Sequence, residues 1–437
     1  MTERPEPTHA GFVSNYPPFA AWTAEALPQV AAHLDTPPMR DVPLGAYVHI
    51  PFCRKRCRFC YFKVHTDVPA STVRDTVSAL TAEARLWSSK AVVRDRPLDF
   101  LYVGGGTPSY LSRGQLRELF DGLQTHLPWH DTISITFEAE PGTVRPEKLQ
   151  LLRDMGVDRL SMGVETFQPR LLDINGRAHG APHIQAAFDM AHALDFPHLN
   201  LDLIAGLVGA TDADWDADIE ATIALAPTSV TIYQLENPPN TWISKQLRQG
   251  ETLTLADDPT KRQWVARAFE RLEAAGYTVT SGYTAVKHEP AGSFAYRDLL
   301  WRGADLIPLG VSAFGHLQGT HLQNHKRLEV WSEQVQAGQF SWSRGYTMTP
   351  RERLIREVVL QLKLGTLVLD PIEKAHGVRL ADVFAGPLQH LVERGLLLVE
   401  PGRWRLTREA LLRVDALLPA FFLAEHGGPP PEPTHVA

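Results

Sequence analysis

The sequence predicts an α/β protein made of a partial (β/α)6 barrel and a small C-terminal winged-helix-like α+β domain. Two observations lead to this fold class. Between residues 44 and 235, six short runs rich in aliphatic and β-branched residues alternate with segments of helical periodicity, which is the pattern of a parallel sheet with crossover helices. The chain also has 437 residues, about three times the ~150 residues of a typical domain, so a second domain is expected.

The strands of the barrel are predicted from their β-branched composition and from the polar segments between them. They are expected at residues 44–50, 98–103, 132–138, 158–164, 198–205 and 228–235. Residues 70–88 carry apolar side chains near helical spacing, and Ser112 with Gln115 forms a capping-box pattern that begins another helix. Because crossovers between parallel strands are right-handed, six such units should curl into an open barrel.

The barrel is assigned to residues 41–240, and three further segments flank it or follow it. Residues 1–40 are rich in proline and are expected to wrap over a surface without forming a domain. Residues 241–345 are assigned to an extension that covers the substrate. Residues 426–437 are expected to be a loose tail.

Residues 346–425 have the pattern of a small separate domain. Helices are predicted over 351–363 and 381–394, followed by a hairpin from Gly395 to Thr407 that turns at Pro401-Gly402, and by a last helix that ends at Phe421-Phe422. A winged helix can bind DNA, but from residue 350 onward eleven Lys and Arg balance eleven Asp and Glu. This domain is therefore expected to act as a lid over substrate.

Composition and charge exclude several classes of function. Hydrophobic residues at 44%, charged residues at 21% and a formal charge of −7 are ordinary globular values, so nucleic acid is not expected as a partner. No apolar run reaches the ~18 residues of a membrane span, and the first residues lack the pattern of a signal peptide. We expect a cytoplasmic protein.

The only three cysteines, Cys53, Cys57 and Cys60, fall within eight residues. A disulfide framework is disfavoured by the odd count, so metal ligation is the leading interpretation. The spacing C-x3-C-x2-C suits zinc with His49 or His65 as a fourth ligand, and it equally suits three irons of a 4Fe-4S cluster. Basic residues interleave with the cysteines and would lower thiol pKa values, which favours the cluster.

Unusual residues also follow the ends of the other predicted strands. Gly104-Gly105-Gly106-Thr107 follows the second strand, Glu138 ends the third, Glu165 follows the fourth and Asp202 lies late in the fifth. Barrel enzymes build their active sites at this rim. The carboxylates suit ammonium and ribose hydroxyl groups, and Arg177 suits a carboxylate, so these groups together suit a nucleoside that also carries an amino acid.

These residues and their surroundings resemble the radical S-adenosylmethionine (SAM) superfamily, in the branch of oxygen-independent coproporphyrinogen III oxidase and the related haem chaperone. The segments that carry the resemblance are YVHIPFC from Tyr47, CRFC from Cys57, GGGTPSYLS from Gly104, FEAEPGTV from Phe137, RLSMGVETF from Arg159, NGRAH from Asn175, NLDLIAGL from Asn200, IYQLENPP from Ile232 and LGVSAFG from Leu309.

The resemblance implies a barrel of the radical SAM kind, with a 4Fe-4S cluster on the three cysteines and one or two molecules of SAM. It places Phe59 near the adenine and implies SAM contacts for Tyr47, Gly105, Gly106, Thr107 and Glu138. It assigns Glu165, Arg177 and Asp202 to nucleoside or second-cofactor positions. It also implies an electron donor such as flavodoxin or ferredoxin.

Three departures bear on the reaction. Phe62 stands where the oxidase carries a fourth cysteine, and Glu165 stands where it carries glutamine. The haem chaperone carries a haem-binding stretch of the type H-N-x-x-Y-W before its W-R-G-G-D segment. The equivalent stretch of this chain is YRDLLW, from Tyr296 to Trp301, followed by RGAD, so the tryptophan is kept and the histidine, asparagine and tyrosine are not.

The sequence thus predicts an enzyme that cleaves SAM reductively to a 5'-deoxyadenosyl radical and acts on a tetrapyrrole or another aromatic small molecule. Oxidative decarboxylation of porphyrinogen propionates to vinyl groups is the first expectation, with Lys287, Arg297 and Arg302 as candidate carboxylate binders. A haem-delivery chaperone and a methyl or methylene transferase are the alternatives.

Overall fold

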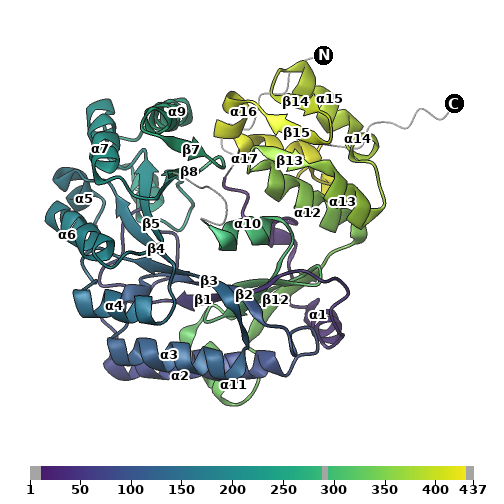
Figure 1. Cartoon of the computed structure of the whole chain (residues 1–437), viewed down its shortest axis with the longest axis horizontal. Helices are drawn as coiled ribbons and strands as arrows, with labels where there is room; N and C mark the ends of the chain where they lie inside the picture. The colour runs from purple at the N-terminus through teal and green to yellow at the C-terminus, as the bar shows by residue number, and fades with distance from the viewer. Residues whose placement is uncertain (1–10, 288–293, 430–437) are drawn as a thin grey trace.

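The computed structural model describes residues 11–287 and 294–429 (Figure 1). Within them the main sheet has twelve strands, in the order β12-β11-β10-β9-β1-β2-β3-β4-β5-β6-β8-β7. The strands are β1 (Leu44–Ile50), β2 (Leu98–Gly105), β3 (Trp129–Ala139), β4 (Arg159–Glu165), β5 (His198–Ala205), β6 (Ser229–Gln234), β7 (Tyr277–Val279), β8 (Thr284–Lys287), β9 (Asp305–Leu309), β10 (Phe314–Leu317), β11 (Thr320–Asn324) and β12 (Trp342–Thr347).

The six predicted strands correspond to β1 to β6, and each pairs in parallel with the next. The predicted α/β class is therefore confirmed. The structure adds a seventh parallel strand that the sequence did not indicate: β9 pairs with the other edge of β1, with Leu44 opposite Asp305 and Val48 opposite Leu309. Antiparallel strands continue the sheet beyond β9 and beyond β6.

Helices cover the outer face of this sheet and follow its strands in turn (Figure 1). They are α2 (Ala70–Ser88), α3 (Arg113–His126), α4 (Pro146–Asp154), α5 (Pro169–Ile174), α6 (Ala181–His192), α7 (Asp212–Leu225), α8 (Trp242–Arg248), α9 (Asp258–Ala274) and α11 (Leu328–Gln336). The helix predicted over 70–88 has these bounds. The predicted capping box begins α3, because the Ser112 hydroxyl accepts from the Gln115 amide at 3.3 Å and the Gln115 side chain accepts from the Ser112 amide at 2.8 Å.

Strand β4 buries apolar side chains on the helix-covered face and polar ones on the opposite face. In β4, Leu160, Met162 and Val164 join the main hydrophobic core, whereas Arg159 and Ser161, on the other face, are buried polar residues. The interior of the curved sheet is therefore polar at β4, whereas near β1 and β2 it is lined by the aromatic side chains of Tyr47, Phe100 and Tyr102.

The C-terminal segment forms a second hydrophobic cluster around a small sheet in the order β13-β15-β14. Its strands are β13 (Thr366–Val368), β14 (Leu397–Glu400) and β15 (Arg403–Leu406), and its helices are α12 (Pro350–Leu362), α13 (Leu369–His376), α14 (Leu380–Val383), α15 (Ala385–Glu393), α16 (Arg408–Leu412) and α17 (Val414–Leu417), followed by the 3-10 turns η3 (Leu418–Phe421) and η4 (Ala424–His426). The predicted small α+β domain and its hairpin at Pro401-Gly402 are confirmed.

Two helices of this segment were predicted as continuous, and the structure shows that each is interrupted. The helix expected over 381–394 is interrupted at Phe384, whose buried ring packs into the domain core. The last helix is divided into α16, α17 and η3, because Arg413 leaves helical geometry (φ −128°, ψ 27°) between α16 and α17. The domain boundaries themselves stay predictions.

The N-terminal segment does more than wrap over a surface. It contains η1 (Phe19–Ala21) and α1 (Leu27–Leu34). Tyr16 is fully buried in the C-terminal cluster, with its ring 4.7 Å from that of Phe422, and Thr23 pairs with Gly345 of β12. The segment thus ties the sheet to the C-terminal domain.

Helix α10 (Ala295–Trp301) lies between the main sheet and the C-terminal domain (Figure 1). It contacts β2, β3 and α12, and the ring of Tyr296 lies 4.3 Å from that of Tyr102. Of the helices in the described ranges, none has the length and hydropathy needed to cross a membrane.

Candidate functional site

The three cysteines lie on the loop that follows β1, at the carboxyl end of the parallel strands. This loop is held at both ends by main-chain hydrogen bonds: Cys53 donates to the His65 carbonyl at 3.1 Å, and Arg58 donates to the Asn175 carbonyl at 3.0 Å. All three thiols are free and half-buried. The loop therefore has one defined path, with the sulfur atoms partly shielded from solvent.

Two polar side chains from other loops, one after β2 and one between α5 and α6, reach the sulfur atoms. The Thr107 hydroxyl donates to Cys53 Sγ at 3.3 Å, and Arg177 Nη1 donates to Cys57 Sγ at 3.2 Å. Burial raises the pKa of Cys53 and of Cys60 to about 11, so thiolates form here only with positive charge close by. A bound metal would supply that charge, and the two donors would offset the remaining negative charge of the sulfur atoms.

The glycine run after β2 lies directly against the cysteine loop. Gly106 donates to the Ile50 carbonyl at 2.8 Å, and a Cβ at Gly106 would lie 2.9 Å from two main-chain oxygens and 3.1 Å from Cys53 Sγ. Gly105 has φ +110°, a conformation that side-chain-bearing residues rarely adopt. Both positions thus require glycine for the loop and the strand end to meet.

Three predicted carboxylates gather inside the curved sheet. Glu138 accepts from the Tyr102 hydroxyl at 2.5 Å and from the Gly105 amide at 3.0 Å, and Asp202 accepts from Ser161 and Asn200, each at 2.9 Å. The pKa values of Glu138 and of Glu165 are raised to about 7, first by burial and also by the charge of Asp202. Such a set of buried like charges favours a cationic ligand.

Arg177 connects the cysteine loop to these carboxylates. Its Nη1 lies 3.5 Å from Glu165 Oε1 and its Nη2 donates to the Gly163 carbonyl, while Nε is buried with no hydrogen-bond partner among the described residues. Glu165 has φ +67° and follows a β-bulge in β4 at Gly163. The bulge directs the carboxylate toward Arg177. A residue whose backbone is held in a strained conformation, as that of Glu165 is, is typical of a functional site.

The remaining predicted contacts lie on two sides of the same interior. Tyr47 is on β1, where its hydroxyl is 2.9 Å from His49 Nδ1. Phe59 packs instead against an apolar cluster of Val208, Leu235 and Ile243. Tyr47 therefore lies on the β1 side of the interior and Phe59 on the β5 and β6 side, as an extended ligand between them would require.

Sequence reasoning missed two buried polar residues in this interior. Arg159 is 2% exposed, its Nη1 donates to the Ser229 hydroxyl at 2.9 Å, and it lies 4.3 Å from the ring of Phe294. Asn200 bonds Asp202 and Ser161 and accepts from Ser229 and Thr231. The signal was present, because polar and apolar residues alternate along β4 and mark one face as polar.

The structure shows other contacts for the two histidines of the zinc alternative. The imidazole of His49 is engaged by Tyr47, and burial lowers its pKa to about 4, while His65 meets the cysteine loop through its main chain. Across residues 11–287 and 294–429, no group of three or more His, Cys, Asp and Glu side chains is arranged to hold a single metal ion, and since this result includes the three cysteines it does not distinguish zinc from a cluster.

The residues present fit a cluster with SAM. Three thiols stand beside hydrogen-bond donors, two glycines leave room that a Cβ would fill, and buried carboxylates face the space where a sulfonium and an ammonium group require negative charge. Arg177 offers a cation for the amino-acid carboxylate or for the cluster.

Comparisons with known proteins agree with this chemistry. A family model described as "Radical SAM superfamily" matches residues 47–221, and one described as "HemN C-terminal domain" matches residues 348–413. The heme chaperone HemW of Mycobacterium tuberculosis (strain H37Rv) is 30% identical over 381 residues, which make up 86% of this chain and 95% of the relative. The oxygen-independent coproporphyrinogen III oxidase of Pseudomonas aeruginosa is 27% identical over 387 residues, with 86% and 81% covered.

A solved structure shows the same fold. Coproporphyrinogen III oxidase (HemN) from Escherichia coli matches with a TM-score of 0.80 at 24% sequence identity, and the match covers 93% of this chain and 96% of that one.

Proposed function

Because the chain belongs to the radical SAM superfamily, in the branch of HemW and oxygen-independent coproporphyrinogen III oxidase, we propose that it holds a 4Fe-4S cluster on Cys53, Cys57 and Cys60. When bound, the reduced cluster would supply the electron that cleaves SAM. The observation that carries this proposal is the placement of Cys53 beside Thr107 and of Cys57 beside Arg177, on one loop with Cys60 and at the same rim as the buried carboxylates.

The chain's own residues would bind and orient the cofactors. Glu138, fixed by Tyr102 and by the Gly105 amide, presents a carboxylate to the ligand's ammonium group, and Asp202 presents one to ribose hydroxyls. Both carboxylates are held by two donors before any ligand arrives, so little rearrangement is needed on binding.

We propose a tetrapyrrole as the substrate, with oxidative decarboxylation of propionates to vinyl groups as the first candidate reaction. The space under the C-terminal domain is bordered by aromatic side chains of α10, as Tyr296 shows. Of the candidate carboxylate binders, Arg302 is exposed and Lys287 Nζ stands 5.7 Å from the ring of Tyr277. Arg297 is 6% exposed and paired with Asp298 at 2.7 Å, so a substrate carboxylate would compete with that ion pair.

A haem-delivery chaperone is the second candidate, and the full-length similarity to HemW favours it. Phe62, which stands in place of the oxidase's fourth cysteine, also favours the chaperone. Phe62 is 41% exposed, and its ring lies 4.5 Å from that of Tyr61. Against it stands Trp301, the retained tryptophan of the chaperone-like stretch, which is 7% exposed and packed in the C-terminal core. Haem binding here would need ligands from elsewhere.

Anaerobic reconstitution with iron and sulfide tests the cofactor. A brown protein that forms 5'-deoxyadenosine from SAM under reduction is expected, and Cys57→Ala should lose both properties. Lys55→Ala is the matched control, because Lys55 is an exposed residue of the same loop, and it should keep both. A colourless zinc protein would refute the proposal.

Product analysis with coproporphyrinogen III then separates the reactions. Vinyl products support the oxidase-type reaction. Tight haem binding and transfer without vinyl products supports the chaperone, and a methylated aromatic product supports the transferase.

A further inference from the structure

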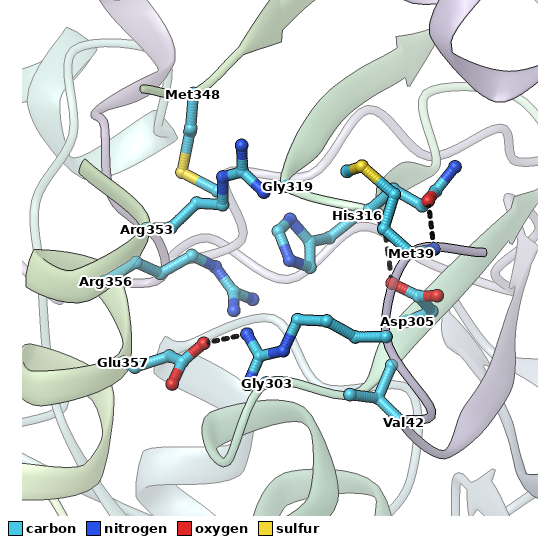
Figure 2. A pocket seen from close by; sticks show the side chains of 12 residues that line it. Met39, Val42, Gly303, Asp305, His316, Gly319, Met348, Arg353, Arg356 and Glu357 are labelled. Carbon is cyan, nitrogen blue, oxygen red and sulfur yellow. Dashed lines mark hydrogen bonds and ion pairs between the residues drawn. The ribbon is translucent and has the colours of Figure 1, made fainter. Parts of the chain in front are cut away.

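A second charged pocket lies at the opposite end of the parallel strands from the cysteine loop. It is bordered by Arg40 and Val42 just before β1, by Asp305 at the start of β9, and by Arg353 and Arg356 of α12 (Figure 2). The seven residues of β1 separate this pocket from the cysteine loop by about 20 Å. It is therefore distinct from the cofactor site.

The acidic residues of this pocket already have cationic partners. Asp305 pairs with Arg96 at 2.8 Å. Glu357 pairs with Arg40 at 2.7 Å and with His376 at 3.2 Å. Neither carboxylate is therefore available to neutralise a further arginine in full.

The positive charges of Arg353 and Arg356 therefore exceed the negative charge that the two carboxylates provide. They are three residues apart on α12 and so share a helix face. Arg356 is 2% exposed; its Nε donates to Asn15 Oδ1 at 2.8 Å, and its guanidinium group points into the pocket toward His316 (Figure 2). Arg353 Nε is buried without a hydrogen-bond partner in the described part of the chain.

The electrostatics of the pocket are those of an anion site. Burial lowers the pKa of Arg356 to about 10, which leaves it charged near neutral pH. Burial, followed by the charges of Arg356, His321, Arg353 and Arg40, holds the pKa of His316 well below its usual value. A buried cation without a full counter-charge is costly, and a bound anion would remove that cost.

The shape of the pocket limits the anion to a small one. Its volume is about 30 Å³, room for roughly two water molecules or one oxyanion group. Gly319 has φ +73°, and a Cβ there would lie 2.5 Å from Arg353 Cδ, so glycine lets the arginine lie against the main chain. Met39, 56% exposed, and the half-exposed Arg40 stand at the edge of the pocket and leave a path from solvent.

We propose that this pocket binds a small oxyanion, inorganic phosphate or the carboxylate end of a small organic acid, between Arg353 and Arg356. The anion would join three parts of the chain. Arg356 is bonded to Asn15 of the N-terminal segment, α12 belongs to the C-terminal domain, and the pocket wall comes from β9 and β10. Its occupancy would therefore stabilise the attachment of the C-terminal domain to the sheet.

The test measures thermal unfolding and calorimetric binding of the wild-type chain in phosphate, in acetate and in chloride at equal ionic strength. Saturable stabilisation and binding are expected in phosphate, in acetate or in both. The salt that raises the unfolding temperature and binds identifies the anion. Replacement of a charged donor should weaken binding by about ten- to a hundredfold, so Arg353→Met and Arg356→Met should each show this loss.

Two further variants keep the result interpretable. Arg356→Lys keeps the charge without the two-pronged donor and should bind with intermediate affinity. Arg379→Gln, at a side chain 79% exposed in the same domain, should bind as the wild type does. If the wild type responds to neither anion beyond chloride, or if both methionine variants bind as it does, the proposal is wrong. The wild-type titration decides even if a variant fails to fold.

Discussion

Replacing Gly106 by alanine should weaken both the fold and the cofactor site, because the added methyl group meets main-chain atoms. The new Cβ would lie 2.9 Å from the carbonyl oxygens of Ile50 and Phe52 and 3.1 Å from Cys53 Sγ. An ordinary contact needs about 3.4 Å, so the strand end must move by roughly 0.5 Å. That movement stretches the 2.8 Å hydrogen bond from Gly106 to Ile50. Overpacking of this kind costs about 1–3 kcal/mol.

The assay for Gly106→Ala combines urea unfolding with iron content after anaerobic reconstitution. We expect a free energy of unfolding lower by about 1–3 kcal/mol and an iron content lower than that of the wild type, since the displaced atoms include Cys53 Sγ, one of the proposed cluster ligands. Gly114→Ala on α3 is the control, because its Cβ would have no neighbour within 4 Å; it should stabilise by about 0.4–1 kcal/mol. If Gly106→Ala keeps wild-type stability and full iron, the close-contact argument is refuted.

Three other predictions test the fold. Ser112→Ala should cost about 1 kcal/mol, because it removes the acceptor for the Gln115 amide, and urea unfolding measures it. Tyr16→Ala should cost about 3 kcal/mol, since the ring is fully buried; tolerance of the change would show that the N-terminal segment only lies on the surface. Burial raises the pKa of Glu83 to about 8. The folded state therefore binds the extra proton, and this contribution to stability is complete below the unfolded value of about 4.5 and is lost as pH rises through 8. Glu83→Gln should flatten that pH dependence in unfolding measured from pH 5 to 8, and an unchanged slope would contradict the assignment.

Strands β1 to β6 were predictable because each is a local run of β-branched and aliphatic residues. β9 was not predictable, because Pro308 interrupts its five-residue run, and proline in a sequence argues against a central strand. Its burial in the sheet depends on pairing with β1, far away in the chain. The three-residue β13 is likewise too short to leave a pattern.

The site was predictable where residues sit at strand ends, as with Glu138 and Asp202. What could not be predicted was the partner of each group. The contact of Arg177 with Cys57 joins the β1 loop to the segment before α6, and no spacing in the sequence encodes it. The tilted ring contact between Tyr296 and Tyr102 has the same origin. Buried arginines such as Arg356 resemble surface residues in sequence, because only packing removes them from water.

The pairing of β1 with β9 sets an order of events during synthesis. β1 and its cysteines leave the ribosome early, whereas residues 305–309, which cover the second edge of β1, are made far later. At ~5–20 residues per second, the interval is on the order of tens of seconds. During that time β1, the strand that precedes the cysteine loop, has one unpaired edge, and its pairing on that side is complete only after about seven-tenths of the chain exists.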